Sequence, residues 1–130
     1  MKTNWTSDSL IEFELKVKKE FEEGKINCPI HLSGGNEEQL ISIFQMIEPE
    51  DYIISTHRNH YHYLLKGGDP DVLMAEIKGE VGGCCKGKGR SMHIYDPKLN
   101  FYTSAIVSGG CAIACGIALG IKKRFKAGIS

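Results

Sequence analysis

One stretch, residues 51–66, places a short strand directly before a cluster of basic side chains and a helical pattern. The run Tyr-Ile-Ile at 52–54 is aromatic and β-branched, which is typical of a strand. Four basic side chains follow within six residues: His57, Arg58, His60 and His62. Helix starts present backbone donors, and a guanidinium binds oxyanions through a fork of N–H groups, so this pattern predicts an anion site. We infer that Arg58, with His57, binds a phosphorylated cofactor.

The size and charge of the chain limit what surrounds this stretch. With 130 residues it is one domain or part of one, long enough for a real core. Its 16 Lys and Arg residues balance 16 Asp and Glu residues, which argues against a general binder of nucleic acid or membrane surfaces. Five cysteines are an odd number, and the N-terminus lacks the apolar segment of a secretory signal. We therefore expect a cytoplasmic location with free thiols.

Four further segments predict helices, and with the strand they indicate an α/β protein. Residues 8–23 carry apolar side chains at helical spacing, with Ser7, Asp8 or Ser9 as the cap. The other three helices are expected at 36–47, capped by Asn36, at 61–65, and at 69–79, where Asp69 precedes Pro70. His31 lies in the loop before the second helix. It could face a pocket or be a solvated loop histidine, and the sequence alone leaves both open.

Residues 79–93 form a glycine-rich basic loop. Gly82, Gly87 and Lys88 have the spacing of a phosphate-binding P-loop. Gly89 stands where that motif needs Ser or Thr for magnesium, and a helix rather than a strand precedes the loop, so we reject a nucleoside-triphosphatase. A flexible loop and an ordered anion-handling loop both fit the sequence.

Residues 105–121 are an uncharged run of 17 residues, followed by Lys122, Lys123 and Arg124. The run is short for a bilayer, and Ser108-Gly109-Gly110 weakens its start, so we expect a buried helix of an α/β domain rather than a membrane anchor.

The cysteines do not indicate a metal site. Cys84 and Cys85 are adjacent, Cys111 and Cys115 are four apart, and no two-residue Cys spacing occurs. No metal ligands are therefore assigned in this chain, and the thiols are expected to be small buried side chains.

Five segments occur in a characteristic order: PIHLSGGNE at 29–37, DYIISTHRNHYHYLLKG at 51–67, DPDVLMAEIKG at 69–79, GGCCKGKGRSMHIYDP at 82–97 and AIVSGGCAIACGIALG at 105–120. Together, over about residues 10–125, they resemble the alpha subunit of thiamine-diphosphate-dependent 2-oxo acid dehydrogenases of the pyruvate, branched-chain and acetoin types. The resemblance implies the N-terminal portion of a thiamine-diphosphate-binding fold, with a parallel sheet flanked by helices. Residues 1–130 would form one partial domain.

The resemblance also implies roles for single residues. His57 and Arg58 match the pair that binds the cofactor's diphosphate. Ala105 and Val107 match a segment whose backbone meets the aminopyrimidine ring. His31 and His60 match histidines at the mouth of the active site, where they handle substrate or an intermediate, and residues 91–93 border the same cleft.

The activity that the resemblance implies is oxidative decarboxylation of a 2-oxo acid, with acyl transfer to a lipoyl group. Thiamine diphosphate would supply the ylid and the electron sink, while the protein orients it. The expected partners are a dehydrogenase beta subunit in a heterotetramer, which contributes the activating glutamate, and a lipoyl acyltransferase. An acetoin dehydrogenase alpha-subunit segment is the alternative.

This sequence also departs from the family pattern. The family holds magnesium through a downstream Gly-Asp-Gly motif and an asparagine, and this chain ends before that point. We therefore expect a truncated or split alpha subunit that binds the cofactor weakly alone and is completed by a second polypeptide. Ala105, Ser108, Gly110 and Ala112 stand where many members have Gly, Gly, Gln and Pro, which weakens the substrate assignment. Two other readings stay open: a non-catalytic remnant acting as an interaction module, and a small membrane-anchored protein.

Overall fold

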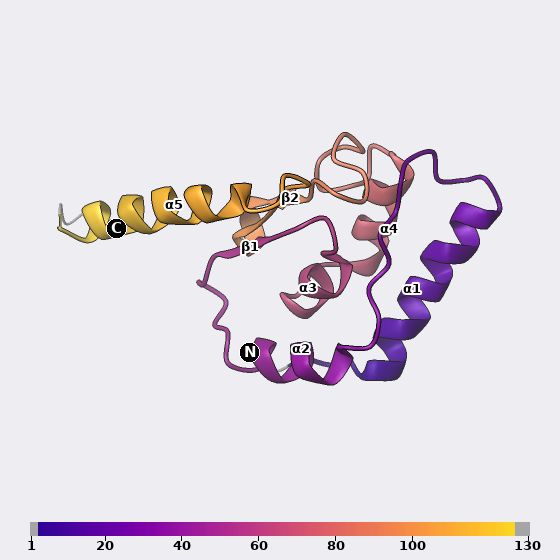
Figure 1. Ribbon diagram of the computed structural model, residues 1–130, viewed down its shortest axis with the longest axis horizontal. Helices are drawn as coiled ribbons and strands as arrows, with labels where there is room; N and C mark the ends of the chain where they lie inside the picture. The colour runs from indigo at the N-terminus through magenta and orange to yellow at the C-terminus, as the bar shows by residue number, and fades with distance from the viewer. Residues whose placement is uncertain (1–2, 127–130) are drawn as a thin grey trace.

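The computed structural model describes residues 3–126, so the predicted domain of residues 1–130 is covered except at its two ends. Five α-helices, three strands and one short 3-10 helix follow one another along the described chain (Figure 1). In order they are α1 (Ser7–Glu22), α2 (Glu37–Phe44), β1 (Ile53–Ser55), α3 (His60–Leu65), α4 (Pro70–Lys78), β2 (Tyr95–Asp96), η1 (Pro97–Leu99), β3 (Phe101–Thr103) and α5 (Gly109–Lys126). The predicted α/β class is confirmed.

The N-terminal helix begins one residue earlier than the sequence predicted. Thr6 is the cap, and it forms a capping box with Ser9, in which each side chain accepts the other's backbone N–H. The helix ends before Gly24, whose φ of +73° suits glycine. Its buried face is Leu10, Phe13 and Val17, as the spacing predicted, whereas Phe21 is exposed.

The second and fourth helices start in different ways. Asp69 caps α4 as predicted, because its carboxylate accepts the N–H groups of Asp71 and Val72. Asn36 precedes α2 but makes no side-chain capping bond. The Glu37 carboxylate accepts the Gly35 N–H instead, so an acidic side chain in the first turn stabilises this helix start.

The three strands form a mixed sheet in the order β1-β3-β2. β1 pairs with β3 in parallel, Ile53 opposite Phe101 and Ser55 opposite Thr103, which agrees with the expected parallel sheet. β2 pairs antiparallel to β3, which the sequence analysis did not predict. The reversal is local: η1 and Asn100, at a φ of +51°, turn the chain back within four residues.

The core is built around α3, which is buried on nearly every side and lies between α2, α4 and the sheet (Figure 1). Tyr61, Tyr63, Leu64 and Leu65 are all buried, and they share one apolar cluster with residues of α1, α4 and β3. A six-residue helix is stable here because tertiary packing rather than its own propensity holds it.

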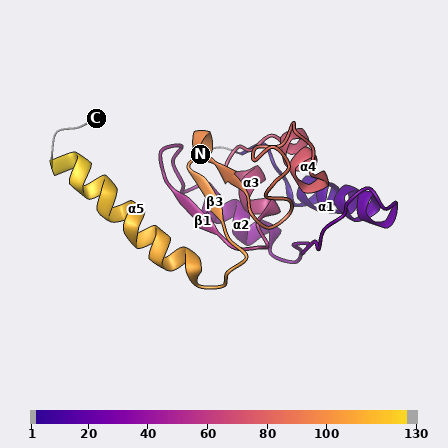
Figure 2. The same cartoon turned by 90° about the horizontal axis from the view of Figure 1, so that it is seen from above.

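The last helix differs from its prediction. Residues 105–121 were expected to form a buried helix, yet no described residue of α5 is buried. Figure 2 shows the helix running away from the sheet, with only its first turn close to β1. An added Cβ on Gly110 would lie 2.7 Å from Ile54, so the contact there is tight. Within the described chain, no helix is long and apolar enough to cross a membrane.

Candidate cofactor-binding site

Two loops that carry predicted cofactor residues leave the sheet at the same edge. β1 and β3 are parallel neighbours, so residues 56–58 and residues 104–107 both follow carboxyl ends of strands. The Ser104 N–H donates to the Ser55 carbonyl over 3.3 Å, which ties the two loops together at their start. Open α/β sheets bind ligands outside the carboxyl ends of their strands, so this edge is the candidate site.

The turn of residues 56–58 meets the loop that carries His31. Arg58 Nη1 donates to the Leu32 carbonyl over 2.6 Å. The rings of His31 and His57 lie edge to face, with centroids 4.8 Å apart and an angle of 77° between their planes. Three predicted site residues from segments 26 positions apart therefore come together here.

Two features of this cluster leave it able to bind an anion. Arg58 is exposed. Its guanidinium has five N–H donors, of which one is hydrogen-bonded within the described structure. His31 Nδ1 is buried and has no hydrogen-bond partner among the described residues. Buried polar atoms are normally partnered, so an orphaned ring nitrogen in the loop that the exposed guanidinium contacts marks an incomplete site.

The predicted aminopyrimidine-contact residues lie in the turn that leads from β3 into α5. Ala105 is half-buried, and Val107 is 70% exposed. The Ile106 N–H donates to Ser104 Oγ, and Ser108 follows with a φ of +67°. Their backbone lies at the carboxyl end of β3, and its contact with a cofactor ring stays a prediction.

His60 is not at the mouth of a cleft, contrary to the sequence analysis. It has no exposed surface. Its Nδ1 is hydrogen-bonded to Glu14 Oε1 at 3.1 Å and its Nε2 to Ser91 Oγ at 2.9 Å. The side chain enters the core because it occupies the first turn of the buried helix α3. Its role in substrate handling stays a prediction without support from its position.

Glu14, His60 and Ser91 share the residue types of a hydrolase triad. All three are buried, and Ser91 has no exposed surface. A nucleophilic serine must reach a substrate carbonyl beside an oxyanion-binding pair of donors. A hydroxyl sealed inside the core cannot do so, and we interpret the three side chains as a structural network.

The glycine-rich loop is ordered around a carboxylate of the protein itself. Glu76 in α4 has no exposed surface, and its two oxygens accept four backbone N–H groups. The donors and distances are Cys85 (2.7 Å), Gly87 (2.9 Å), Gly89 (2.7 Å) and Arg90 (3.2 Å). Successive backbone N–H groups that converge in this way form an anion-binding nest. The loop is thus ordered and binds an anion, which was one of the two interpretations of its sequence. The anion, however, is the Glu76 carboxylate of the protein itself.

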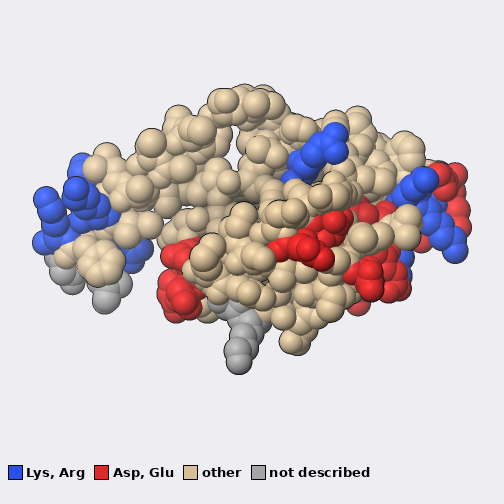
Figure 3. All heavy atoms as spheres, turned by 60° about the horizontal axis from the view of Figure 1, so that its bottom comes forward, with Lys and Arg blue, Asp and Glu red and all other residues tan. Residues whose placement is uncertain are grey.

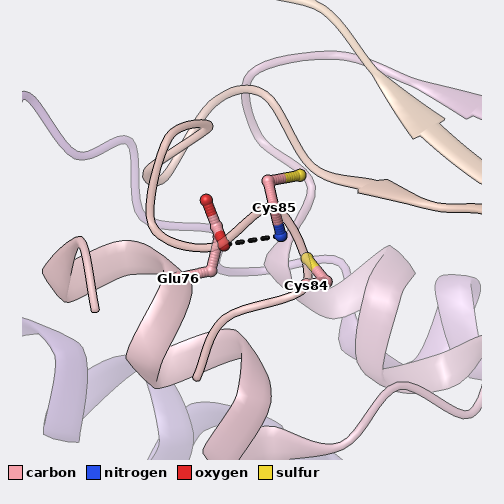
Figure 4. A group of neighbouring side chains, drawn as sticks. All are labelled: Glu76, Cys84 and Cys85. Atoms are coloured by element: carbon pink, nitrogen blue, oxygen red, sulfur yellow. Dashed lines mark hydrogen bonds between the residues drawn. The ribbon is translucent and has the colours of Figure 1, made fainter. Parts of the chain in front are cut away.

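Cys84 and Cys85 lie beside Glu76, as Figure 4 shows. One potential ligand atom from each of the three residues lies within 4.8 Å of the others. A carboxylate has about four acceptor positions, and the loop occupies four, so Glu76 has none left for a metal. Burial, together with the neighbouring Cys85 and Glu76, raises the pKa of Cys84 to about 12, which keeps it a neutral thiol. The cluster therefore stabilises the loop and does not have the character of a metal site.

Glu76 and Glu14 are structural residues that were not predicted, although the sequence carries a signal for both. Glu76 falls on the same helical face as Leu73 and Ile77, and Glu14 falls with Leu10 and Val17. An acidic residue at a core position of an amphipathic helix must be paired internally. Five glycines in residues 79–93 indicate a loop whose backbone can approach another group closely, and two of them, Gly87 and Gly89, donate their N–H groups to Glu76.

An apolar groove between α5 and the sheet lies at the other end of β1. It is lined by Glu50, Asp51, Tyr52, Ile54 and Asn100 on one side and by Ala114, Ile117, Ala118, Ile121, Arg124 and Phe125 on the other. Several of these residues precede β1, so the groove lies toward the amino end of the strand. The candidate site lies at the carboxyl end and is therefore separate from it. Figure 3 shows basic side chains gathered at the far end of α5, where its last turn carries Lys123, Arg124 and Lys126.

Comparison with known proteins assigns the chain to a family. The profile of the family described as dehydrogenase E1 component matches residues 6–130. The chain belongs to the dehydrogenase E1 component family. This confirms the resemblance on which the sequence analysis rested.

Curated relatives of this E1 chain have two kinds of name. It is 41% identical over 127 residues to the alpha subunit of acetoin:2,6-dichlorophenolindophenol oxidoreductase from Bacillus subtilis, covering 95% of this chain and 38% of that protein. The corresponding subunit from Cupriavidus necator is 40% identical over 116 residues, with 88% and 35% covered. The pyruvate dehydrogenase E1 component subunit alpha of Porphyra purpurea is 35% identical over 107 residues, with 82% and 31% covered. The chain thus spans about a third of the length of these relatives.

Proposed function

We propose that this chain supplies the diphosphate-binding side of a thiamine-diphosphate site in a dehydrogenase E1 alpha subunit. The observation that carries the proposal is the meeting of Arg58, His57 and His31 at the carboxyl edge of two parallel strands. Membership of the E1 family supports the choice of cofactor.

The residues present fit one part of such a site. The exposed guanidinium of Arg58 would donate to diphosphate oxygens, and the unpartnered Nδ1 of His31 offers a further donor when that nitrogen carries a proton. The backbone of residues 105–107 would orient the ring end of the cofactor. Once bound, thiamine diphosphate supplies the carbanion chemistry and the electron sink. We expect magnesium in the complete site, and we assign no residue of this chain to hold it.

The activity that we propose for the assembled enzyme is oxidative decarboxylation of a pyruvate-like 2-oxo acid, with acyl transfer to a lipoyl group. A dehydrogenase beta subunit, a polypeptide that supplies the rest of the alpha subunit and a lipoyl acyltransferase are its proposed partners. The names of the relatives favour a second candidate, the acetoin reaction, because the two acetoin subunits are 41% and 40% identical to this chain and the pyruvate subunit of Porphyra purpurea 35%.

The test is calorimetric titration with thiamine diphosphate and magnesium, with and without the polypeptide encoded directly downstream. A charge-assisted hydrogen bond contributes about 1.5–3 kcal/mol, so Arg58→Ala should weaken binding about tenfold to 150-fold. Arg58→Lys keeps the positive charge but loses the fork of N–H donors, so its affinity for the cofactor should lie between those of the wild type and Arg58→Ala.

Lys88→Ala is the matched control, because it removes an exposed cation from the glycine-rich loop. Its affinity should equal that of the wild type. Binding that depends on Arg58 and on the second polypeptide would support a split alpha subunit. An absence of binding in every combination would refute the proposal and favour a non-catalytic interaction module.

A further inference from the structure

The turn that carries Arg58 has few restraints of its own. Thr56 and Arg58 are both exposed, and the Arg58 N–H reaches Thr56 Oγ1 only at 3.5 Å. A guanidinium must be held in one geometry to bind two anion oxygens at once, because each freely rotating side chain loses conformational entropy on binding. The restraint on this turn therefore has to come from its neighbours.

Asn59 and His60, directly after the turn, are fully buried and supply that restraint. The Asn59 Nδ2 group donates to the Thr56 carbonyl over 3.0 Å, which closes the turn on itself. The same nitrogen donates to the Ser91 carbonyl over 3.1 Å. His60 Nε2 is hydrogen-bonded to Ser91 Oγ. Ser91 thus contacts both residues, one through its backbone and one through its side chain.

Ser91 is itself fixed by the nest around Glu76. The two residues before it, Gly89 and Arg90, donate their N–H groups to Glu76 Oε1. Ser91 has no exposed surface, so nothing but the protein interior holds it. The backbone from Arg90 to Ser91 therefore connects the hydrogen bonds around the buried Glu76 carboxylate with those that Ser91 and Asn59 make to the turn of residues 56–58.

We infer that Asn59 and Ser91 are positioning residues for Arg58, and that the affinity of the turn for a diphosphate depends on them although neither side chain is exposed to a ligand. The inference rests on the proposed function for the identity of the anion. The positioning of the turn itself does not require it.

The test is NMR spectroscopy of the ¹⁵N-labelled chain, with inorganic pyrophosphate as the probe. In the ligand-free protein, the heteronuclear NOE of the Arg58 amide should fall in Asn59→Ala and in Ser91→Ala, because the turn becomes more mobile. Tyr63→Phe is the matched control. It removes the partly buried hydrogen bond that the Tyr63 hydroxyl donates to Asp96, in the helix that begins at His60, and leaves the bonds of the turn in place.

Titration then measures the effect on binding. Loss of one neutral hydrogen bond should weaken pyrophosphate binding about twofold to tenfold in Ser91→Ala, and at least as much in Asn59→Ala. Tyr63→Phe should bind as the wild type does, even where its melting temperature falls as far as that of Ser91→Ala. This separation distinguishes positioning from a general loss of stability.

The outcomes separate the two proposals. An unchanged Arg58 NOE in both variants would overturn the inference, whether or not pyrophosphate binds. Wild-type affinity in both variants would overturn it as well. If the amides at 56–60 of the wild type do not respond to pyrophosphate either alone or with the second polypeptide, while the NOE changes are present, the result would count against the diphosphate site and uphold the positioning of the turn.

Discussion

Two regions of this chain deal with negative charge in opposite ways. Around Glu76 the anion is built in: a fully buried carboxylate is enclosed by four backbone N–H groups. At the turn of residues 56–58 the donors are side chains, Arg58 is exposed, and a ring nitrogen of His31 has no partner in the described structure. The region with the glycine-rich, P-loop-like sequence is therefore saturated, and the short basic turn is the one still able to accept a ligand.

The largest effect on stability is expected when the internal anion, the Glu76 carboxylate, is removed. Glu76→Ala would leave four backbone N–H groups unpaired, one buried and three partly buried, each costing up to about 3 kcal/mol, although these costs are not additive. We expect a loss of at least about 3 kcal/mol in the free energy of unfolding, measured by urea denaturation. Glu12→Ala, which removes an exposed carboxylate paired with Lys16, should change stability by less than about 0.5 kcal/mol. Equal midpoints for the two variants would contradict the internal nest.

A smaller effect is expected from the glycines of the same loop. A Cβ on Gly89 would collide with the His93 carbonyl, and a backbone atom cannot move away cheaply. Gly89→Ala should therefore destabilise by about 1–3 kcal/mol. Gly82→Ala is the matched control, because its Cβ would meet only the Ala75 methyl at 3.7 Å. Thermal unfolding of both variants measures the difference, and similar melting temperatures would show that the loop is looser than described.

In the turn of residues 56–58, substitution should change the affinity for an anion more than the stability of the fold. Arg58→Ala is expected to lower the free energy of unfolding by less than about 1 kcal/mol, because an exposed side chain that loses one hydrogen bond is replaced by water. Its effect on anion affinity should be far larger. Urea denaturation beside the calorimetric titration checks both. A large loss of stability in this variant would place Arg58 with the structural residues.

The smallest effect concerns pH. Burial lowers the pKa of His62 from 6.5, and the ring stacks on Phe44 and is hydrogen-bonded to Ser55 Oγ. Because the folded state favours neutral His62, the unfolded chain binds more protons as the pH falls below about 6.5, and stability decreases. We expect a contribution of about a few tenths of a kcal/mol per pH unit between pH 6.5 and 5.5. His62→Gln should flatten this dependence in urea denaturation at several pH values, and an unchanged slope would contradict the assignment.

Much of the fold could be predicted because its signals are local. Two helices show this. Helix α4 was predicted from Asp69 before Pro70 and from Gly79 at its end, and α1 from the spacing of Leu10, Phe13 and Val17; the structure has both. Thr6 was missed because Ser7, Asp8 and Ser9 are equally good caps on residue type alone. β2 was missed because two residues followed by a proline carry no strand periodicity.

The candidate site could be predicted only where residue chemistry and position agree. Arg58 and His57 follow a strand directly, so their place at the sheet edge could be inferred from the sequence. His60 lies two residues after Arg58 and has the same residue type as His57, yet it points into the core because α3 turns its first residue inward. For α5, the apolar composition indicated burial, but a covering surface is a property of the whole fold and not of the segment.

Because α5 is exposed, its backbone amides should exchange with solvent at a different rate from those of α3. An isolated helix of 18 residues is only marginally stable in water, and α5 has no buried side chain to stabilise it. Its amides should therefore exchange with solvent through local fraying, within a small factor of a free peptide. The amides of α3, enclosed by the apolar core, can exchange only when the whole domain unfolds. Protection of α5 that rose to the level of α3 would thus report, residue by residue, the moment at which a covering surface docks.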